Sequence, residues 1–170
     1  VGNQSFGYFA GGSQFGQGNH SWVRRLDYSN DAVATSLKGP LTFRSDGICG
    51  TGNANYGYLN ANNYGNAGTK IERIDYGNDT ATAATKGPLS AARKYLAATG
   101  NGSYGYFAGG WSPGHLSSID RMDYGNDTAT ATPKGNLANP GNNWAAAGNT
   151  NYGWITAGES PSTGYMTSIN

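Results

Sequence analysis

A repeat of 48 residues constrains this chain more than any other feature of its sequence. The pattern Arg-x-Asp-Tyr occurs three times, and its aspartates, Asp27, Asp75 and Asp123, stand 48 residues apart. A repeat of this length is one supersecondary unit that cannot bury its hydrophobic face alone, so successive units must stack on one another. The sequence therefore predicts an array of similar units.

Two further markers follow nearly the same period. An aromatic-Gly-aromatic box begins at four positions that lie 50, 48 and 48 residues apart: Phe6, Tyr56, Tyr104 and Tyr152. The pattern Lys-Gly-(Pro or Asn)-Leu begins at Lys38, Lys86 and Lys134. On these markers the chain holds three full repeats and about half of a fourth. We expect residues 1–170 to be a segment of a single repeat domain cut from a longer chain, or else one of several chains that close a ring together.

Each repeat reads as four short strands bounded by Gly, Asn, Asp or Pro. In the third repeat we expect these strands at residues 95–99, 104–108, 119–124 and 128–132. A tight hairpin turn is expected at residues 125–127, because Gly and Asn tolerate positive φ. Four strands in about 48 residues match the size of one propeller blade. The predicted fold class is all-β, with units of four antiparallel strands.

Composition supports a folded β-protein and excludes several function classes. The chain has 28 Gly and 12 Tyr, and 12% of its residues are aromatic, whereas disordered chains are poor in aromatic residues. Its net charge of +1 gives no basic excess for binding nucleic acid. No apolar run approaches the roughly 18–20 residues that cross a bilayer, so membrane insertion is not expected.

The repeat resembles the kelch-type β-propeller repeat. A hydrophobic strand that runs into a Gly-Gly pair at residues 106–110, the aromatic-acidic pair Asp123-Tyr124 and the Pro-containing exit at residues 86–89 match the kelch pattern. The Gly-Gly pair is replaced by Asn60-Ala61 in one repeat and by Ala157-Gly158 in another, and Ala and Thr replace the usual Trp of the fourth strand. The resemblance implies blades of a β-propeller and covers the whole chain.

The wording Tyr-Gly-Tyr-Phe-Ala-Gly-Gly, with Asp-Tyr-Gly-Asn-Asp-Thr-Ala-Thr-Ala, is similar to kelch-like arrays in structural proteins of marine tailed phages, including cyanophages. This resemblance implies a non-enzymatic virion protein, a tail fibre or similar appendage, that acts as a scaffold and recognises a host surface. The expected partners are other virion proteins, copies of the chain itself, and a glycan or protein receptor outside the cell. Two alternatives are a secreted bacterial carbohydrate-binding β-propeller and a propeller enzyme whose catalytic residues lie outside these residues.

Recognition is expected in the loops after each aromatic box, because they vary while the frame is kept. These loops span residues 13–21, 62–69, 111–117 and 159–167. The candidate binding residues in them are Phe15, His20, Tyr64, Trp111, His115 and Tyr165. Exposed aromatic side chains stack on sugar rings or anchor protein interfaces. The alternative is that these aromatics fold back onto their own loops.

No catalytic residue, metal site or cofactor is predicted. The two histidines stand in different repeats at non-equivalent positions, and Cys49 has no second cysteine with which to form a disulfide or a cysteine-based zinc site. Cys49 aligns with Ala97 and Ala145, where a small buried residue is expected. The Asp-Tyr-x-Asn-Asp segments gather oxygen ligands that suit calcium, but they lack the spacing of an EF-hand loop and also suit a turn.

A charge pair recurs on the predicted third strand of each repeat. Arg25 with Asp27, Arg73 with Asp75, and Arg121 with Asp123 lie two residues apart, and therefore on one face of a strand. We expect these pairs to form a charge ladder between neighbouring blades.

Overall fold

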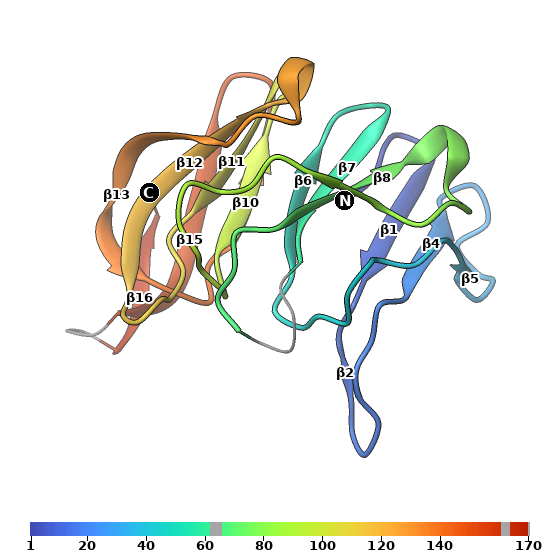
Figure 1. Ribbon diagram of the computed structural model, residues 1–170, viewed down its shortest axis with the longest axis horizontal. Helices are drawn as coiled ribbons and strands as arrows, with labels where there is room; N and C mark the ends of the chain where they lie inside the picture. Colours follow the sequence, from blue (N-terminus) through green and yellow to red (C-terminus); the bar gives the residue numbers. More distant parts are fainter. Residues whose placement is uncertain (62–65, 161–163, 170) are drawn as a thin grey trace.

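The computed structural model describes residues 1–61, 66–160 and 164–169, and it consists mainly of antiparallel strands (Figure 1). The first sheet contains β1 (Phe6–Ala10), β4 (Val23–Asp27) and β5 (Ser36–Leu37). The second contains β6 (Cys49–Gly52), β7 (Tyr56–Asn60), β8 (Ile71–Asp75) and β9 (Ala84–Lys86). The third contains β10 (Ala97–Gly100), β11 (Tyr104–Ala108), β12 (Leu116–Asp123) and β13 (Thr132–Gly141). The fourth contains β14 (Ala145–Gly148), β15 (Gly153–Ser160) and β16 (Gly164–Ile169).

The sheets stand side by side in chain order, with β10 packed against both β6 and β14 (Figure 1). A separate hairpin of β2 (Ser13–Gln14) and β3 (Gly18–Asn19) follows the second strand position of the first repeat. The short 3-10 turns η2 (Tyr76–Asn78) and η3 (Tyr124–Asn126) lie at the opposite end of the sheets from this hairpin. We call the two ends the loop end and the turn end. The described residues form open sheets, which do not close into a barrel or ring.

The predicted all-β class and the repeat register are confirmed. In the second and third sheets the aromatic box pairs with the Arg-x-Asp-Tyr strand in the same register, Tyr56 opposite Asp75 and Tyr104 opposite Asp123. The first sheet repeats this register with Phe6 opposite Asp27. The two markers therefore face each other across one pair of strands.

Other predicted boundaries were wrong. The fourth strand of the third repeat begins at Thr132, whereas it was expected at residues 128–132, because residues 124–126 form η3 instead of a tight hairpin. Gly125 does not adopt positive φ, so that predicted turn geometry was also wrong. The first strand begins at Ala97, after Tyr95 in a left-handed conformation with φ of +56°. The loop expected at residues 159–167 consists largely of the ends of β15 and β16.

An asparagine shapes the turn between the first and second strands of every repeat. Its side-chain oxygen accepts hydrogen bonds from the backbone N–H groups two and three residues later, at 2.9–3.0 Å. This arrangement is an Asx turn, which lets a short polar side chain replace a backbone turn contact. The four residues are Asn3, Asn53, Asn101 and Asn149.

The hydrophobic core lies between successive sheets. One cluster joins the first and second sheets through residues such as Tyr8 and Leu59, and a second joins the second and third through Tyr58 and Phe107. A third cluster includes Trp144 and lies between the third and fourth sheets. Burial of one such large apolar side chain contributes about 1.5–3 kcal/mol. Each repeat therefore depends on its neighbour for its core.

Candidate recognition surface and the contacts that position it

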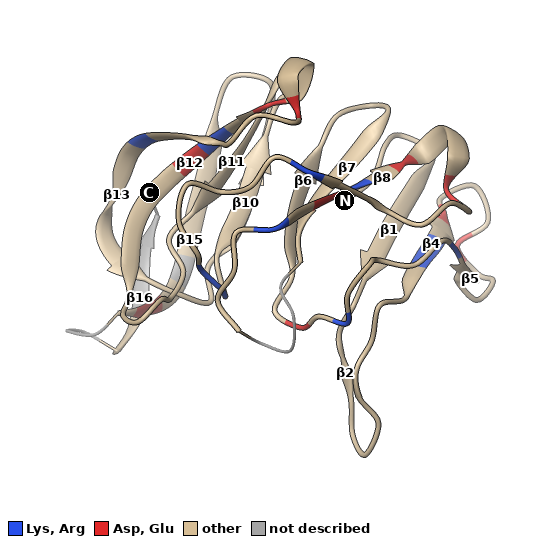
Figure 2. Cartoon of the chain, in the orientation of Figure 1, with Lys and Arg blue, Asp and Glu red and all other residues tan. Residues whose placement is uncertain are grey.

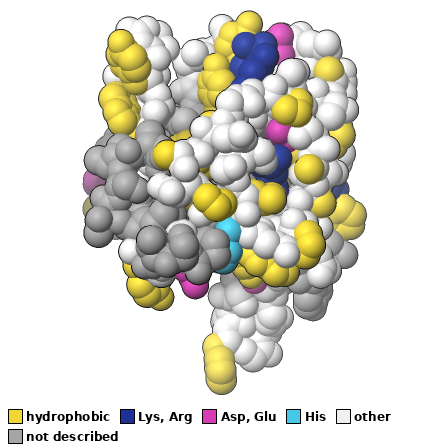
Figure 3. Space-filling model, turned by 90° about the vertical axis from the view of Figure 1, so that its left-hand side faces the viewer, with side chains coloured by type: hydrophobic (Ala, Val, Ile, Leu, Met, Phe, Trp, Pro, Cys, Tyr) yellow, Lys and Arg dark blue, Asp and Glu magenta, His cyan; other side chains and the backbone are white. Residues whose placement is uncertain are grey.

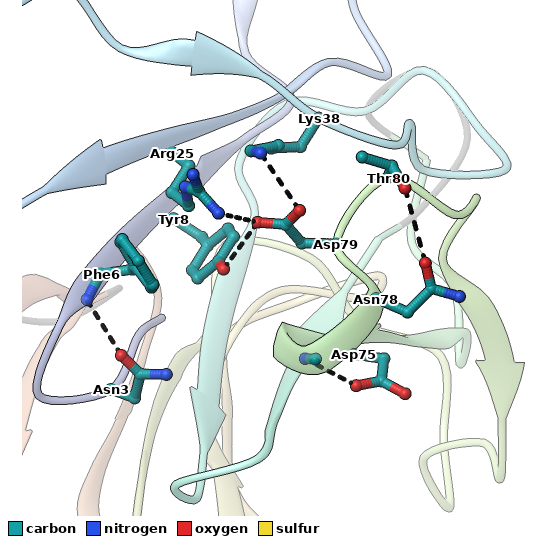
Figure 4. A network of polar contacts seen from close by, with 10 residues as sticks. Asn3, Phe6, Tyr8, Arg25, Lys38, Asp75, Asn78, Asp79 and Thr80 are labelled. Atoms are coloured by element: carbon teal, nitrogen blue, oxygen red, sulfur yellow. Dashed lines mark hydrogen bonds and ion pairs between the residues drawn. The ribbon is translucent and has the colours of Figure 1, made fainter.

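One aspartate of the second repeat ties the first sheet to the second (Figure 4). The Asp79 carboxylate accepts a hydrogen bond from the Tyr8 hydroxyl at 2.9 Å, and it pairs with Arg25 Nη1 at 2.8 Å and Lys38 Nζ at 3.2 Å. These three partners lie on β1, on β4 and just after β5. A single buried carboxylate therefore gathers all three strands of the neighbouring sheet.

The same contact recurs one repeat later. Asp127 accepts a hydrogen bond from Tyr58 at 3.0 Å and pairs with Arg73 at 2.6 Å and Lys86 at 3.1 Å. The predicted ladder between sheets involves the expected arginines, but its acidic partner was wrong. Asp75 instead accepts the N–H of the next turn and caps η2. The arginine pairs with the second aspartate of the following repeat because that residue, and not Asp75, points into the gap between sheets.

The Lys-Gly marker belongs to this contact as well. The Gly39 N–H donates to the backbone oxygen of Asp79 at 2.9 Å, and the Gly87 N–H donates to that of Asp127 at 2.8 Å. A Cβ atom at either glycine would collide with a backbone carbonyl of the neighbouring turn. We name the whole arrangement the aspartate contact: one carboxylate held by Tyr, Arg and Lys side chains and by the N–H of the glycine after the lysine.

The aspartate contact fixes the charge of its members. Burial alone raises the pKa of Asp79, but hydrogen bonds from Tyr8 and Lys38 and the nearby positive charges outweigh it, so the pKa lies below its ordinary value. The pKa of Asp127 is lowered in the same way. Burial and the hydrogen bond to Asp79 raise the pKa of Tyr8 to about 12. At neutral pH the contact therefore holds a neutral tyrosine, a carboxylate and two cations. Figure 2 shows basic and acidic segments lying near one another along the row of sheets.

Two buried acids support the connections that run between sheets. Glu72 and Asp120 occupy equivalent positions on β8 and β12 and have no exposed surface. Asp120 accepts the backbone N–H of Ser90 at 2.8 Å and pairs with Arg93 at 3.2 Å. Glu72 accepts the backbone N–H of Thr42 at 3.1 Å. Because these acids hold connecting backbone in place, the sheets offer a rigid base for the loops beside them.

Phe15 is the most exposed of the predicted recognition residues. It lies at the tip of the β2–β3 hairpin, and its relative exposure is 103%. Figure 3 shows a hydrophobic side chain at the tip of a projection below the body of the molecule. The base of the hairpin is tied to the sheet by the His20 N–H, which donates to Gly12 at 2.9 Å, and by the Gly12 N–H, which donates to Ser45 at 2.8 Å.

His20 is not a free loop side chain. Its ring stacks on Trp22 with centroids 3.9 Å apart and an interplanar angle of 12°. Within the described residues, its buried Nε2 atom has no hydrogen-bond partner. Arg24 lies over the other aromatic ring of this group, 5.3 Å from the Trp22 centroid. The result is a stacked group at the base of the hairpin, with Trp22 39% exposed.

Trp111 and His115 come together in the third repeat. Their backbones form a bridge, and Trp111 exchanges two backbone hydrogen bonds with Lys94 at 2.8 and 3.2 Å. The Lys94 ammonium lies 5.1 Å from the Trp111 ring and 5.0 Å from the Tyr95 ring. Trp111 is thus half-buried beside a cation. In the part of the chain that the structure describes, no ring contact joins Phe15 to this group.

The remaining candidates divide between a strand and a segment outside the description. Tyr165 lies on β16 and is 89% exposed. Tyr64 lies outside the described residues. Sequence reasoning missed Trp22 and Phe43, which is half-exposed with Lys70 Nζ 3.6 Å from its ring centroid. Neither residue recurs at the repeat period, so the repeat gave no signal for them.

Other features relevant to chemistry are few. Burial raises the pKa of the Cys49 thiol to about 12. Over residues 1–61, 66–160 and 164–169, no three His, Cys, Asp or Glu side chains are grouped so that they could hold a metal ion. The same ranges contain no helix that is long and apolar enough to cross a membrane.

Comparison with known proteins places the chain by fold alone. The geometry defines an all-β protein of small antiparallel sheets in series. Neither a family model nor a curated protein matches its sequence. A solved structure described as "Structure of YjhT" is similar to it, with a TM-score of 0.73 and 15% sequence identity. The match covers 89% of this chain and 49% of that one, so the chain spans about half the length of the structure it resembles.

Proposed function

We propose that the sheets are blades of a kelch-like β-propeller and that the chain is a non-enzymatic segment of a virion structural protein. In this proposal the segment belongs to a tail fibre or similar appendage outside the cell. The aspartate contacts make it a scaffold, and the loop end recognises a host surface. The series of sheets at a 48-residue period supports the first part, and the wording of the repeat supports the second.

The observation that carries the recognition proposal is the placement of Phe15. It extends fully into solvent on a hairpin whose base is hydrogen-bonded to a rigid sheet. An aromatic side chain on a fixed support loses little conformational entropy on binding, which makes it an effective anchor. The stacked group of His20 and Trp22 lies directly at the base of this hairpin.

The alternative function is that of a secreted bacterial carbohydrate-binding β-propeller. The hairpin favours a sugar ligand through its composition, because Gln14 and Gln17 flank Phe15. Aromatic faces stack on sugar rings, while amide groups donate and accept the hydrogen bonds that sugar hydroxyls require. Both functions use the same surface, and they differ in the origin of the chain.

Adsorption to cells tests the proposal. Fluorescently labelled chain is applied to a panel of cyanobacterial and other marine bacterial cells, as wild type, Phe15→Ser and Trp111→Ala. Phe9→Ser is the matched control, because Phe9 is 60% exposed but lies on β1. We expect Phe15→Ser to abolish adsorption with an unchanged melting temperature, and Phe9→Ser to retain it. Adsorption unaffected by both loop substitutions would overturn recognition by the loop end.

Competition with soluble sugars separates the two origins. Inhibition by simple sugars across unrelated bacteria favours the secreted carbohydrate-binding protein. Adsorption restricted to one host and dependent on Phe15 favours the phage appendage.

A further inference from the structure

The third sheet carries one half of an aspartate contact whose other half is missing from the chain. Tyr106, Arg121 and Lys134 occupy the positions of Tyr58, Arg73 and Lys86 one repeat later, on β11, β12 and β13. No carboxylate in the described part of the chain forms an ion pair with Arg121 or Lys134. The fourth repeat has no equivalent of Tyr124 or Asp127 within its residues.

Arg121 is already in the position that binds a carboxylate. Its guanidinium lies 4.4 Å from the centroid of the Tyr104 ring. Arg73 lies 4.2 Å from Tyr56 and Arg25 lies 4.2 Å from Phe6, and both of those arginines pair with an aspartate. The aromatic ring therefore orients the arginine in all three sheets, with or without its acid.

A cleft stands where a tyrosine packs in the preceding repeat. Tyr124 stacks on Tyr58 with ring centroids 4.7 Å apart, and its hydroxyl lies 3.0 Å from Thr51 Oγ1. One repeat later, the equivalent residues Tyr106 and Thr99 line a cavity of about 220 Å³ together with Asn149, Gly153 and Ile155.

Glycines show that this cleft has the shape of the earlier one. A Cβ on Gly105 would lie 2.7 Å from the Thr51 methyl group and 2.8 Å from the Tyr124 hydroxyl. A Cβ on Gly153 would likewise lie 2.7 Å from the Thr99 methyl group, but it would meet no tyrosine. The walls of the tyrosine site are therefore preformed.

The edge of the fourth sheet is open beside the same cleft. The equivalent residues of β11, Tyr104 to Tyr106, pair with β12 through Arg121 to Asp123. Residues 153–155 of β15 pair with β14 but have no strand on their other side within the described residues. Gly135, which follows Lys134, also faces open space, whereas Gly87 contacts the next turn.

We propose that this cleft is a docking site for the strand-and-turn segment of a further repeat, which adds as a strand to the open edge of β15. Its tyrosine stacks on Tyr106 and bonds to Thr99, and its aspartate three residues later pairs with Arg121 and Lys134. The partner is thus a polypeptide carrying Asp-Tyr-x-x-Asp after a strand. The complementarity is one of charge, ring stacking and free backbone edge, the usual elements of strand addition.

The test adds the segment as a separate peptide to the full 170-residue chain. The peptide is residues 116–137 of this sequence, which contain the third strand, η3 and the start of the fourth strand. Calorimetry measures its affinity, and amide NMR shifts of Thr99 and Gly153 locate it. The control peptide carries Tyr124→Ala and Asp127→Ala. Chain variants are Arg121→Gln at the site and Arg44→Gln at an exposed position elsewhere.

We expect the peptide to bind with shifts at Thr99 and Gly153. Arg121→Gln and the control peptide should each weaken binding about tenfold or more, because a hydrogen bond to a charged group is lost, while Arg44→Gln has no effect. Equal binding of both peptides, or the absence of shifts at Thr99 and Gly153, would overturn the proposal. Concentration-dependent dimerisation of the chain that Asp31→Asn abolishes would overturn it too, since the site would then take a second copy.

Discussion

The Asp79 carboxylate and the Arg25 guanidinium lie 2.8 Å apart, although 54 residues separate them in the chain. Asp127 and Arg73 repeat this relationship at 2.6 Å with the same separation. A contact that spans slightly more than one repeat joins neighbouring units, so it converts a sequence period into a stacked array. The scaffold on which the recognition loops stand depends on this pair.

The aspartate contacts predict a loss of stability in acid. The pKa values of Asp79 and Asp127 are lowered in the folded chain, so near pH 4 the unfolded chain binds more protons than the folded one. Their stabilisation is complete above the unfolded value of about 3.9 and is lost as pH falls through the folded pKa. Chemical denaturation between pH 7 and pH 2 measures it. Asp79→Asn should flatten the decline below pH 4, and an unchanged decline would exclude Asp79 as its cause.

Val1→Thr should stabilise the chain. The Tyr124 hydroxyl bonds to Thr51, but the buried Tyr76 hydroxyl has no partner in the described residues. The residue equivalent to Thr51 beside Tyr76 is Val1, whose methyl group approaches Gly57. A threonine there would supply the missing hydrogen bond, which is worth about 1 kcal/mol. Thermal unfolding measures the gain. The same substitution with Tyr76→Phe should give no gain, and an equal gain in that background would contradict the explanation.

The glycine of the aromatic box should be irreplaceable. A Cβ on Gly105 would lie 2.8 Å from the Tyr124 hydroxyl and 2.7 Å from Thr51, so Gly105→Ala must displace a buried tyrosine. We expect a loss of about 1–3 kcal/mol in the free energy of unfolding, as for other overpacked cores. Gly102→Ala is the matched control, because nothing lies within 4 Å of its Cβ position. Equal effects of the two substitutions would show that the tyrosine does not require this glycine.

Cys49 should react with alkylating reagents only when the chain opens. Burial raises the pKa of its thiol to about 12, and the thiolate is the reactive form. At pH 8 its alkylation, followed by mass spectrometry, should be much slower than that of a short peptide and should accelerate in denaturant. Rapid alkylation of the native chain would contradict the burial of this thiol.

The sequence predicted the repeat, the all-β class and the second strand of each unit, because glycine-flanked aromatic boxes recur at a fixed period. It did not show which aspartate faces the neighbouring sheet. Asp75 and Asp79 belong to one Asp-Tyr-x-Asn-Asp segment, and only the geometry of η2 places the first at the cap and the second in the gap. The fourth strand was misplaced for the same reason, since η3 takes up residues that resemble a strand.

The recognition surface was less accessible to sequence reasoning. Loop variability indicated Phe15 and Trp111, but nothing in the period indicated that His20 would stack on Trp22 or that Lys94 would lie beside Trp111. These contacts join residues from loops and connections that have no counterpart in the other repeats. Their partners are set by tertiary packing and not by local pattern.

A comparison of two pairs of substitutions tests most directly the claim that the second aspartate of each segment holds the array together. Asp79→Asn with Asp127→Asn removes the charge from both aspartate contacts, whereas Asp75→Asn with Asp123→Asn alters only the caps of η2 and η3. The free energy of unfolding is measured by denaturant titration at pH 7. We predict a loss of several kcal/mol for the first pair, because two arginines and two lysines lose their buried partner, and about 1 kcal/mol per site for the second. Equal losses, or a larger loss for the Asp75 and Asp123 pair, would contradict the account.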